Sequence, residues 1–245
     1  MVSKLTHVDA TSLFEETLAR IRNAICDGAL SPNERLTQDR IAERLNVSRM
    51  PVNQALLLLK AQGFVIDTGR RGVRVAPIDP VIVHDIYAIR DALDPLAARL
   101  AVSQPIDAAT RDEGKQLLKA GDDALASGST DALIKADMTF HRFIYRLSGN
   151  RFMADLFNLH SDHLRRVMQA VLLSGRAHHR FWEEHRAIFA AIVGGDSERA
   201  VKLSHAHVRE AAASVRKALS PAAAASPAAN VRPKANGKAT MKAKS

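Results

Sequence analysis

Two short segments with helical spacing of apolar residues, joined by a tight turn, occupy positions Leu36–Leu59. The apolar positions that keep this spacing are Ile41, Ala42 and Leu45 in the first segment and Val52, Ala55, Leu56 and Leu59 in the second. Asn46-Val47 suits the turn, and Ser48 suits the N-cap of the second helix. Arg49 would project from the first turn of that helix, where a recognition helix presents side chains to base edges. The alternative is an ordinary helical hairpin in an all-α core, and the flanking segments favour the first interpretation.

The flanking segments complete the pattern of a winged helix-turn-helix. A preceding helix is expected from about residue 12 to Gly28, which ends it. Beyond the second helix, residues 64–66 and 73–75 are predicted to form two strands joined by a turn. The tip of this wing, Gly69-Arg70-Arg71-Gly72, places two guanidinium groups on flexible backbone, which suits phosphates or a minor groove. A solvated surface turn is the alternative for the tip.

Composition excludes several classes of protein. Hydrophobic residues make up 47% of the 245 residues and aromatic residues 4%, which favours Leu- and Ala-rich helices over aromatic-rich sheets. The formal net charge is +9, but the segment from residue 221 onward has five basic residues and no acidic one, so charge alone is weak evidence for nucleic acid. Cys26 is the single cysteine, which excludes a disulfide framework and a thiolate metal cluster. With no apolar signal core or membrane-length run, a cytoplasmic protein is expected, on the nucleoid when bound to DNA.

A series of short motifs runs through residues 12–77. These motifs are Ile25, Gly28-Ala29-Leu30, Pro32-Asn33-Glu34-Arg35-Leu36, Ile41-Ala42, Val47-Ser48-Arg49, Pro51-Val52, Ala55-Leu56, Gly63-Phe64-Val65 and Arg71-Gly72-Val73-Arg74-Val75. Their order and spacing resemble the DNA-binding domain of GntR-family bacterial repressors. The resemblance implies that the helix beginning at Ser48 enters the major groove of double-stranded DNA.

The resemblance also implies which residues contact DNA. These residues are Arg35, Thr37, Ser48, Arg49, Met50, Asn53, Arg70, Arg71 and Gly72. Two positions depart from the family, which usually has Arg-Glu where this chain has Asn53-Gln54. Since Asn and Gln can pair bidentately with adenine N6 and N7, the departure predicts an altered operator preference with DNA binding retained.

The rest of the chain is predicted to be helical. Pro77 and Pro80 indicate a linker over residues 78–82, since each proline disfavours the α region for the preceding residue. Six helices are then expected, over residues 83–102, 105–126, 130–147, 151–173, 177–193 and 196–218. The apolar side of the first is expected to be Ile86, Ile89, Leu93, Leu96 and Leu100. Helices joined by short turns form an antiparallel bundle.

The predicted fold class is therefore mainly α, with a winged helix-turn-helix over 12–77 followed by an all-α bundle over 83–218. Residues 1–11 are expected to be a flexible N-terminus. The Ala/Pro/Lys tail, 219–245, is expected to be disordered, because such a composition buries too little apolar area to offset its chain entropy. The tail is either inert or attracts DNA nonspecifically.

A possible metal site lies within the predicted bundle. Asp137 and His141 are four residues apart, so they share one helical face, and His185 and His207 lie on later helices. Converging inside a bundle, such nitrogen and oxygen ligands suit zinc, nickel, manganese or iron. Taken singly, each histidine is better explained as a satisfied polar residue than as a metal ligand. The chain has ten histidines, so chance pairs are expected.

Four motifs make this region resemble a known ligand-binding domain. They are Arg90-x-x-Leu93-x-x-x-Ala97-Ala98, Asp137-x-x-x-His141, Ser148-Gly149-Asn150 and Glu184-His185-x-x-Ile188-x-x-Ala191-Ile192. They resemble the C-terminal domain of the fatty-acid-regulator subfamily of GntR proteins, the FCD type. Many members of that subfamily hold a divalent metal with one Asp and three His.

By that resemblance, the metal ligands are expected to be Asp137, His141, His185 and His207, with zinc as the first choice of metal. His205 is the rival for the last place, on a different helical face. The resemblance also implies that Arg90 offers a cation to a small carboxylate effector. An ion pair of Arg90 with Asp91 or Asp94 is the alternative.

The sequence thus predicts a transcription regulator, more specifically a repressor, that binds a pseudo-palindromic operator as a homodimer and responds to a small organic acid at the metal site. The alternative is a metal-dependent hydrolase with a fused winged domain. Against an enzyme, the chain lacks His-Glu-x-x-His, and Glu184 is expected to point away from the face that carries His185. A third interpretation is a purely structural metal with unregulated DNA binding.

Overall fold

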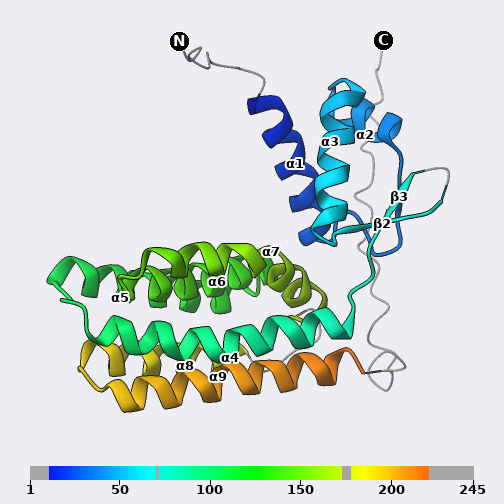
Figure 1. The fold of residues 1–245 in the computed structure, drawn as a ribbon. Coiled ribbons are helices and arrows are strands. Elements are labelled where there is room, and N and C mark those ends of the chain that lie inside the picture. The colour runs from blue at the N-terminus through cyan, green and yellow to red at the C-terminus, as the bar shows by residue number, and fades with distance from the viewer. Residues whose placement is uncertain (1–10, 70–71, 173–177, 221–245) are drawn as a thin grey trace, which may run out of the picture.

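The computed structural model describes residues 11–69, 72–172 and 178–220, so the predicted wing tip Arg70-Arg71, the N-terminus 1–10 and the tail 221–245 lie outside the described residues. Two parts are apparent, each with its own apolar core. Figure 1 shows the N-terminal part, in blue to cyan, standing over one end of a layered bundle of long helices. None of the described helices combines the length and the apolar character needed to cross a membrane.

The N-terminal part is the predicted winged helix-turn-helix. Its elements are α1 (Thr11–Cys26), β1 (Arg35–Leu36), α2 (Gln38–Leu45), α3 (Arg49–Ala61), β2 (Val65–Asp67) and β3 (Val73–Val75). The three strands form an antiparallel sheet in the order β1-β3-β2. The strand predicted over residues 64–66 is β2, which begins one residue later, at Val65. β1 was not predicted, since two residues are too few for an alternating pattern.

Local signals explain the helix-turn-helix. The Oγ1 of Thr37 caps α2 by accepting a hydrogen bond from the Arg40 amide at 3.4 Å. Asn46 ends α2 in the left-handed region, with φ 53° and ψ 48°, which asparagine tolerates better than most residues. Ser48 precedes α3 in the extended conformation of an N-cap. Its side chain, however, makes no capping bond to the described residues, contrary to expectation.

The C-terminal part is the predicted bundle. Its helices are α4 (Pro80–Val102), α5 (Ala108–Ser127), α6 (Thr130–Leu147), α7 (Arg151–Leu172), α8 (His178–Val193) and α9 (Ser197–Ala218). The prediction of a linker through residue 82 was wrong, because Pro80 opens α4 at its first helical position and Asp79 caps it by accepting from the Val81 amide. Ile89, expected on the buried side of α4, is 48% exposed.

Two glycines on α5 allow α8 to pack closely against it. A Cβ on Gly121 would lie 1.6 Å from the Trp182 ring, and one on Gly114 would lie 2.0 Å from the Phe189 ring. The indole of Trp182 also donates a hydrogen bond of 2.8 Å to the Leu118 carbonyl. These contacts fix the rotation of α8 about its own axis, and hence the direction in which its other residues point.

Polar contacts join α7 to the N-terminal part. Arg165 donates to Asp27 at 2.7 Å and to Asn23 at 3.2 Å. The ring of His163 stacks on Phe64 at 4.1 Å, and its Nε2 lies 2.8 Å from the Gln62 carbonyl oxygen. One end of α7 therefore lies against the first part while the rest of the helix packs inside the bundle.

Candidate functional site

Three buried histidines from three different helices converge in the bundle. His141 comes from α6, His185 from α8 and His207 from α9, and one ligand nitrogen of each lies within 4.8 Å of the others. The Nε2 atoms of His185 and His207 are 3.3 Å apart. The helix packing, and not the spacing along the chain, therefore brings these imidazoles to one point.

Asp137 lies beside this group, as the sequence predicted. Its Oδ1 is 3.5 Å from Nε2 of His185 and 3.8 Å from Nε2 of His141. Burial raises the pKa of the Asp137 carboxyl, even though the nearby Arg90 favours its charged form. A buried carboxylate of this kind gains most from a cation placed next to it.

His205, the rival for the fourth ligand position, points elsewhere. Its Nδ1 lies 2.9 Å from Asp91 at the surface, and its side chain is 39% exposed. The two-residue offset from His207 places it on another face of α9, as helical geometry requires.

Glu184 corrects an expectation. It was expected to point away from the site, yet its Oε2 lies 2.8 Å from Nδ1 of His207. This contact holds the His207 ring with its Nε2 toward the other histidines, as carboxylates do behind metal-ligating imidazoles. The register between α8 and α9 creates the contact, and no spacing in the sequence could have indicated it.

Two of the histidines, His141 and His185, are held in the neutral form that binds metals. Burial, followed by the nearby positive charges, lowers the pKa of His141 and of His185 well below the usual range. The imidazoles are therefore neutral at pH 7, with lone pairs free to coordinate a cation. Nδ1 of His185 is buried and has no hydrogen-bond partner among the described residues.

Arg90 forms the ion pair that was the alternative for it, and it also contacts the histidine group. Its Nη2 donates to Oδ2 of Asp94 at 2.8 Å, which is the predicted ion pair, and both side chains are buried. The same Nη2 lies 3.1 Å from Nε2 of His141, so the guanidinium also reaches the histidine group. Asp94 accepts a second hydrogen bond of 2.5 Å from the Tyr145 hydroxyl, and sequence reasoning did not identify Tyr145.

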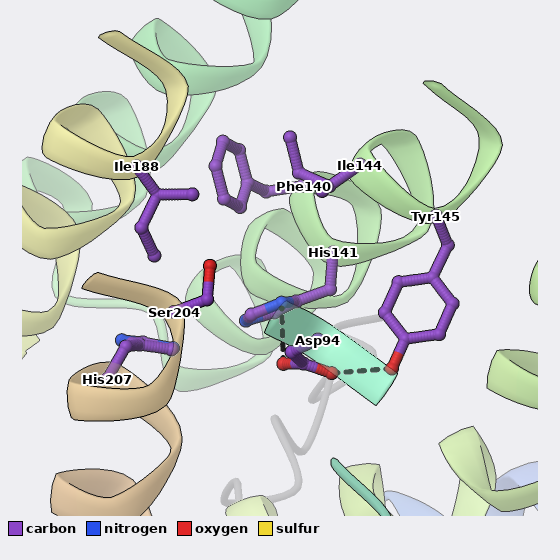
Figure 2. A pocket seen from close by; sticks show the side chains of 8 residues that line it. All are labelled: Asp94, Phe140, His141, Ile144, Tyr145, Ile188, Ser204 and His207. Atoms are coloured by element: carbon purple, nitrogen blue, oxygen red, sulfur yellow. Dashed lines mark hydrogen bonds and ion pairs between the residues drawn. The ribbon is translucent and has the colours of Figure 1, made fainter. Parts of the chain in front are cut away.

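A small cavity opens between these side chains. Figure 2 shows Asp94, His141, Tyr145, Ser204 and His207 around it, with apolar side chains closing the other side. The space in it that the centre of a water molecule can occupy is about 10 Å³. That volume corresponds to about one water molecule, so a ligand of several atoms needs the lining side chains to move.

The residue types and charges fit a divalent metal. A tetrahedral zinc site with Zn–N bonds of about 2.0–2.1 Å has donor atoms about 3.3 Å apart. The 3.3 Å between His185 and His207 matches that value, and the contacts of Asp137 are only slightly longer. Three imidazoles and one buried carboxylate make up the donor set that such an ion requires, and Glu184 behind His207 adds an outer contact.

The described residues among those predicted to contact DNA lie on α3, on β1 and at positions directly before α2, α3 and β3. Arg49, Met50 and Asn53 are exposed on α3, and Nε of Arg49 pairs with Asp39 at 2.5 Å. In the sheet, Arg35 lies opposite Arg74, a residue that the prediction omitted, and both are exposed. Two arginines that face each other across this strand pair suit an anion such as phosphate.

Gly72 and Thr37 have structural roles at the same surface. Gly72 has a φ of +109°, and a Cβ there would lie 2.9 Å from the Leu36 carbonyl oxygen. Only glycine fits such a backbone at this distance. Thr37 caps α2, as described above.

Comparison with known protein families decides what kind of protein carries these two sites. The model of the bacterial regulatory proteins, gntR family, matches residues 13–75, and that of the FCD domain matches residues 85–210. The chain belongs to the GntR family of FCD-type transcription regulators. GntR regulators bind DNA through the winged domain and small-molecule effectors through the FCD domain, so this protein is a DNA-binding regulator and not an enzyme.

Curated relatives agree with this assignment. The chain is 27% identical over 194 residues to YdhC of Bacillus subtilis, an uncharacterized HTH-type transcriptional regulator, covering 77% of this chain and 84% of the relative. It is 24% identical over 217 residues to the HTH-type transcriptional repressor RspR of Escherichia coli, covering 86% and 93% of the two chains.

Solved structures share the fold. McbR/YncC of Escherichia coli superimposes with a TM-score of 0.72 at 20% identity, covering 89% of this chain and 99% of that one. A GntR-type protein from Rhodococcus sp. RHA1 gives a TM-score of 0.73 at 23% identity, covering 85% and 100%.

Proposed function

We propose that this GntR-family regulator is a repressor that binds a pseudo-palindromic operator as a homodimer. A small organic acid, bound at a divalent metal in the FCD domain, would release the protein from the operator or modulate its binding. Asp137, His141, His185 and His207 would hold the metal, with zinc as the first choice and nickel, manganese or iron as alternatives.

The observation that carries the proposal is the buried group of three histidines beside Asp137. One ligand nitrogen of each histidine lies within 4.8 Å of the others, so the three side chains can share one cation. Glu184 behind His207 adds the outer contact that orients a metal-ligating imidazole. When bound, the metal would supply a positive charge with open coordination positions, to which a carboxylate can bind.

Arg90 lies where metal binding would free it to bind a carboxylate effector. Its Nη2 lies 3.1 Å from Nε2 of His141, so a metal that takes this nitrogen removes the contact with Arg90. The freed N–H group would then be available to a carboxylate beside the metal, in competition with Asp94. This arrangement favours an anionic effector over a neutral one.

The small cavity supports a coupling between effector binding and movement. The space of about 10 Å³ does not hold an organic acid until side chains such as Tyr145 and Ser204 move. A ligand that binds only the opened form has different affinities for the two forms, and therefore shifts their populations. The contacts of Arg165 and His163 with the DNA-binding part give α7 a route by which this shift can reach the operator.

The repressor and homodimer assignments have separate support. The relative RspR is named a transcriptional repressor, which favours repression over activation here. A single winged domain reads only a few base pairs, and two-fold symmetry doubles that contact on a palindromic site. The proposal therefore predicts that operator affinity depends on protein concentration in the range where dimers form.

Metal analysis tests the site. Purified protein is expected to contain close to one divalent ion per chain, with the content falling at least tenfold in His141→Ala and in His185→Ala. His205→Ala is the matched control, because this histidine lies two residues from His207 but pairs with Asp91 at the surface. Unchanged metal content in both site variants would overturn the metal site.

A thermal-shift screen with small carboxylic acids tests the effector class. Acids that bind are expected to raise the melting temperature of the metal-loaded protein and to have no effect after chelation. The same acids should then reduce the affinity of the protein for its operator DNA. Stabilisation that is equal with and without chelator would contradict the metal-anchored effector.

A further inference from the structure

The outer face of α3 carries two large apolar side chains. Met50 is 71% exposed and Leu57 is 59% exposed. They are seven residues apart, which is close to two helical turns, so they lie one above the other on the same face. The opposite face is buried in the domain core through Val52, Ala55 and Leu59. Met50 and Leu57 are thus at the centre of the surface that a recognition helix presents.

Two amide side chains flank this apolar stripe. Asn53 and Gln54 are both exposed and lie on either side of the line from Met50 to Leu57. Arg49 stands at the start of the same helix. The surface therefore combines one cation, two amides and two alkyl groups.

Gln38 from α2 fixes one of these amides. Its Nε2 donates a hydrogen bond of 2.8 Å to Oδ1 of Asn53. The acceptor of Asn53 is then engaged within the protein, and its Nδ2 donors remain available to a partner. A bidentate contact with adenine needs both an acceptor and a donor, and Oδ1 keeps only one of its two lone pairs for such a contact, so the hydrogen bond from Gln38 biases Asn53 toward donating.

A groove continues this surface toward the wing. It has a volume of about 220 Å³, and its lining includes Gln38, Asn53, Leu57, Lys60 and Gly72. Leu57 of the apolar stripe, Asn53 with its partner Gln38, and Gly72 of the wing therefore line one groove.

The chemistry of base edges identifies what such a surface reads. In the major groove, the C5-methyl of thymine is the only apolar group that a base pair presents. Guanine N7 and O6, adenine N7 and thymine O4 accept hydrogen bonds. We propose that Met50 and Leu57 read thymine methyl groups in the operator half-site, and that Gln38 is a positioning residue that biases Asn53 toward donating hydrogen bonds to the bases.

The surroundings favour DNA over a second protein as the occupant of this face. The stripe lies on the helix that family membership assigns to DNA, and Arg49 and Lys60 near its two ends are cations that suit phosphates. The inference rests on the proposed operator binding. The experiment separates a failure of operator binding from a failure of the thymine assignment.

The experiment begins with selection of a binding sequence by the full-length protein from random duplex DNA. Each thymine of the selected half-site is then replaced in turn by uracil, which removes only the methyl group. At the contacted positions, the wild-type affinity is expected to fall about fourfold, which corresponds to about 0.8 kcal/mol for one methyl-sized apolar group.

Variants assign each contact. Met50→Ala and Leu57→Ala are each expected to bind thymine and uracil duplexes equally at one position and to keep the sensitivity at the other. Leu58→Ala is the matched control, because Leu58 is 37% exposed but lies off the line of the stripe. Gln38→Ala should relax the base preference at one further position while leaving the salt dependence of binding unchanged, since no phosphate contact is lost.

Each outcome decides a separate point. If selection enriches no sequence, the proposed operator binding fails. If a sequence is enriched but uracil has no effect at any position, the thymine assignment is overturned. If Leu57→Ala changes the oligomeric state and leaves the uracil sensitivity intact, Leu57 contacts protein and the inference is wrong for that residue.

Discussion

Replacing Arg90 with methionine in the metal-free protein removes the cation from a buried ion pair. Arg90 and Asp94 have side chains that are 3% and 5% exposed, and their charged groups lie 2.8 Å apart. Breaking such a pair leaves one uncompensated buried charge, which typically costs about 3–5 kcal/mol. The Tyr145 hydroxyl remains as a hydrogen-bond donor to Asp94, so we expect a loss near the lower figure, about 3 kcal/mol.

The assay is urea unfolding followed by the fluorescence of Trp182, the single tryptophan in the chain, which reports on the bundle. Arg186→Met is the matched control, because Arg186 pairs with Asp122 at 2.6 Å but the two side chains are 38% and 43% exposed. An exposed pair of this kind is expected to contribute about 1 kcal/mol or less.

A double variant isolates the pair itself. Asp94→Asn removes the charge and keeps an acceptor for Tyr145, so Arg90→Met combined with Asp94→Asn should recover about 1–3 kcal/mol of the loss. A loss under about 1 kcal/mol for Arg90→Met, with no recovery in the double variant, would refute the reasoning. Arg90 would then contribute to effector binding alone.

Three further predictions concern the packing and the local structure. Gly121→Ala should destabilise the bundle by about 3 kcal/mol in urea unfolding, because the added Cβ would lie 1.6 Å from the Trp182 ring. A loss below about 1 kcal/mol would contradict that close approach. Thr37→Ala should lower the free energy of unfolding of the N-terminal domain by about 1 kcal/mol and Ser48→Ala by under about 0.5 kcal/mol, both measured by thermal melting. Of the two side chains, only Thr37 accepts a capping bond from a described residue, so equal losses would contradict this difference. Burial raises the pKa of Cys26 to about 12, so a thiol reagent at pH 8 should label the folded protein far more slowly than the urea-unfolded chain, and equal rates would show that the thiol is accessible. Because this folded pKa lies above the usual value of 9.0, the stability that the neutral thiol contributes is present below pH 9 and falls as the pH rises toward 12, which a comparison of wild type with Cys26→Ala would reveal.

Helix bounds were well predicted where the sequence has clear start and stop residues. The bounds of α6 agree with the prediction of 130–147, since Ser129 caps its first turn and Ser148-Gly149-Asn150 follows its end. The start of α4 was misplaced because proline was interpreted only as a breaker, although it is also favoured at the first position of a helix.

The candidate site was predicted through its family resemblance and completed by the packing. Spacing alone placed Asp137 and His141 on one face. The roles of Glu184 and Asp94 depend on how α8 and α4 are rotated against their neighbours, which a single sequence does not encode in any local pattern. The same reason explains why the Gln38–Asn53 hydrogen bond between two helices could not be expected.

Trp182 gives the protein an internal optical probe. The indole lies edge-on to the His185 ring, 4.8 Å between centroids, so an ion held by that imidazole would lie in the immediate surroundings of the fluorophore. A closed-shell ion such as Zn²⁺ would leave the emission bright, whereas ions with unpaired electrons, such as Mn²⁺ and high-spin Fe²⁺, would quench it. A titration followed at one wavelength would therefore report both occupancy and the electronic class of the metal, without any label.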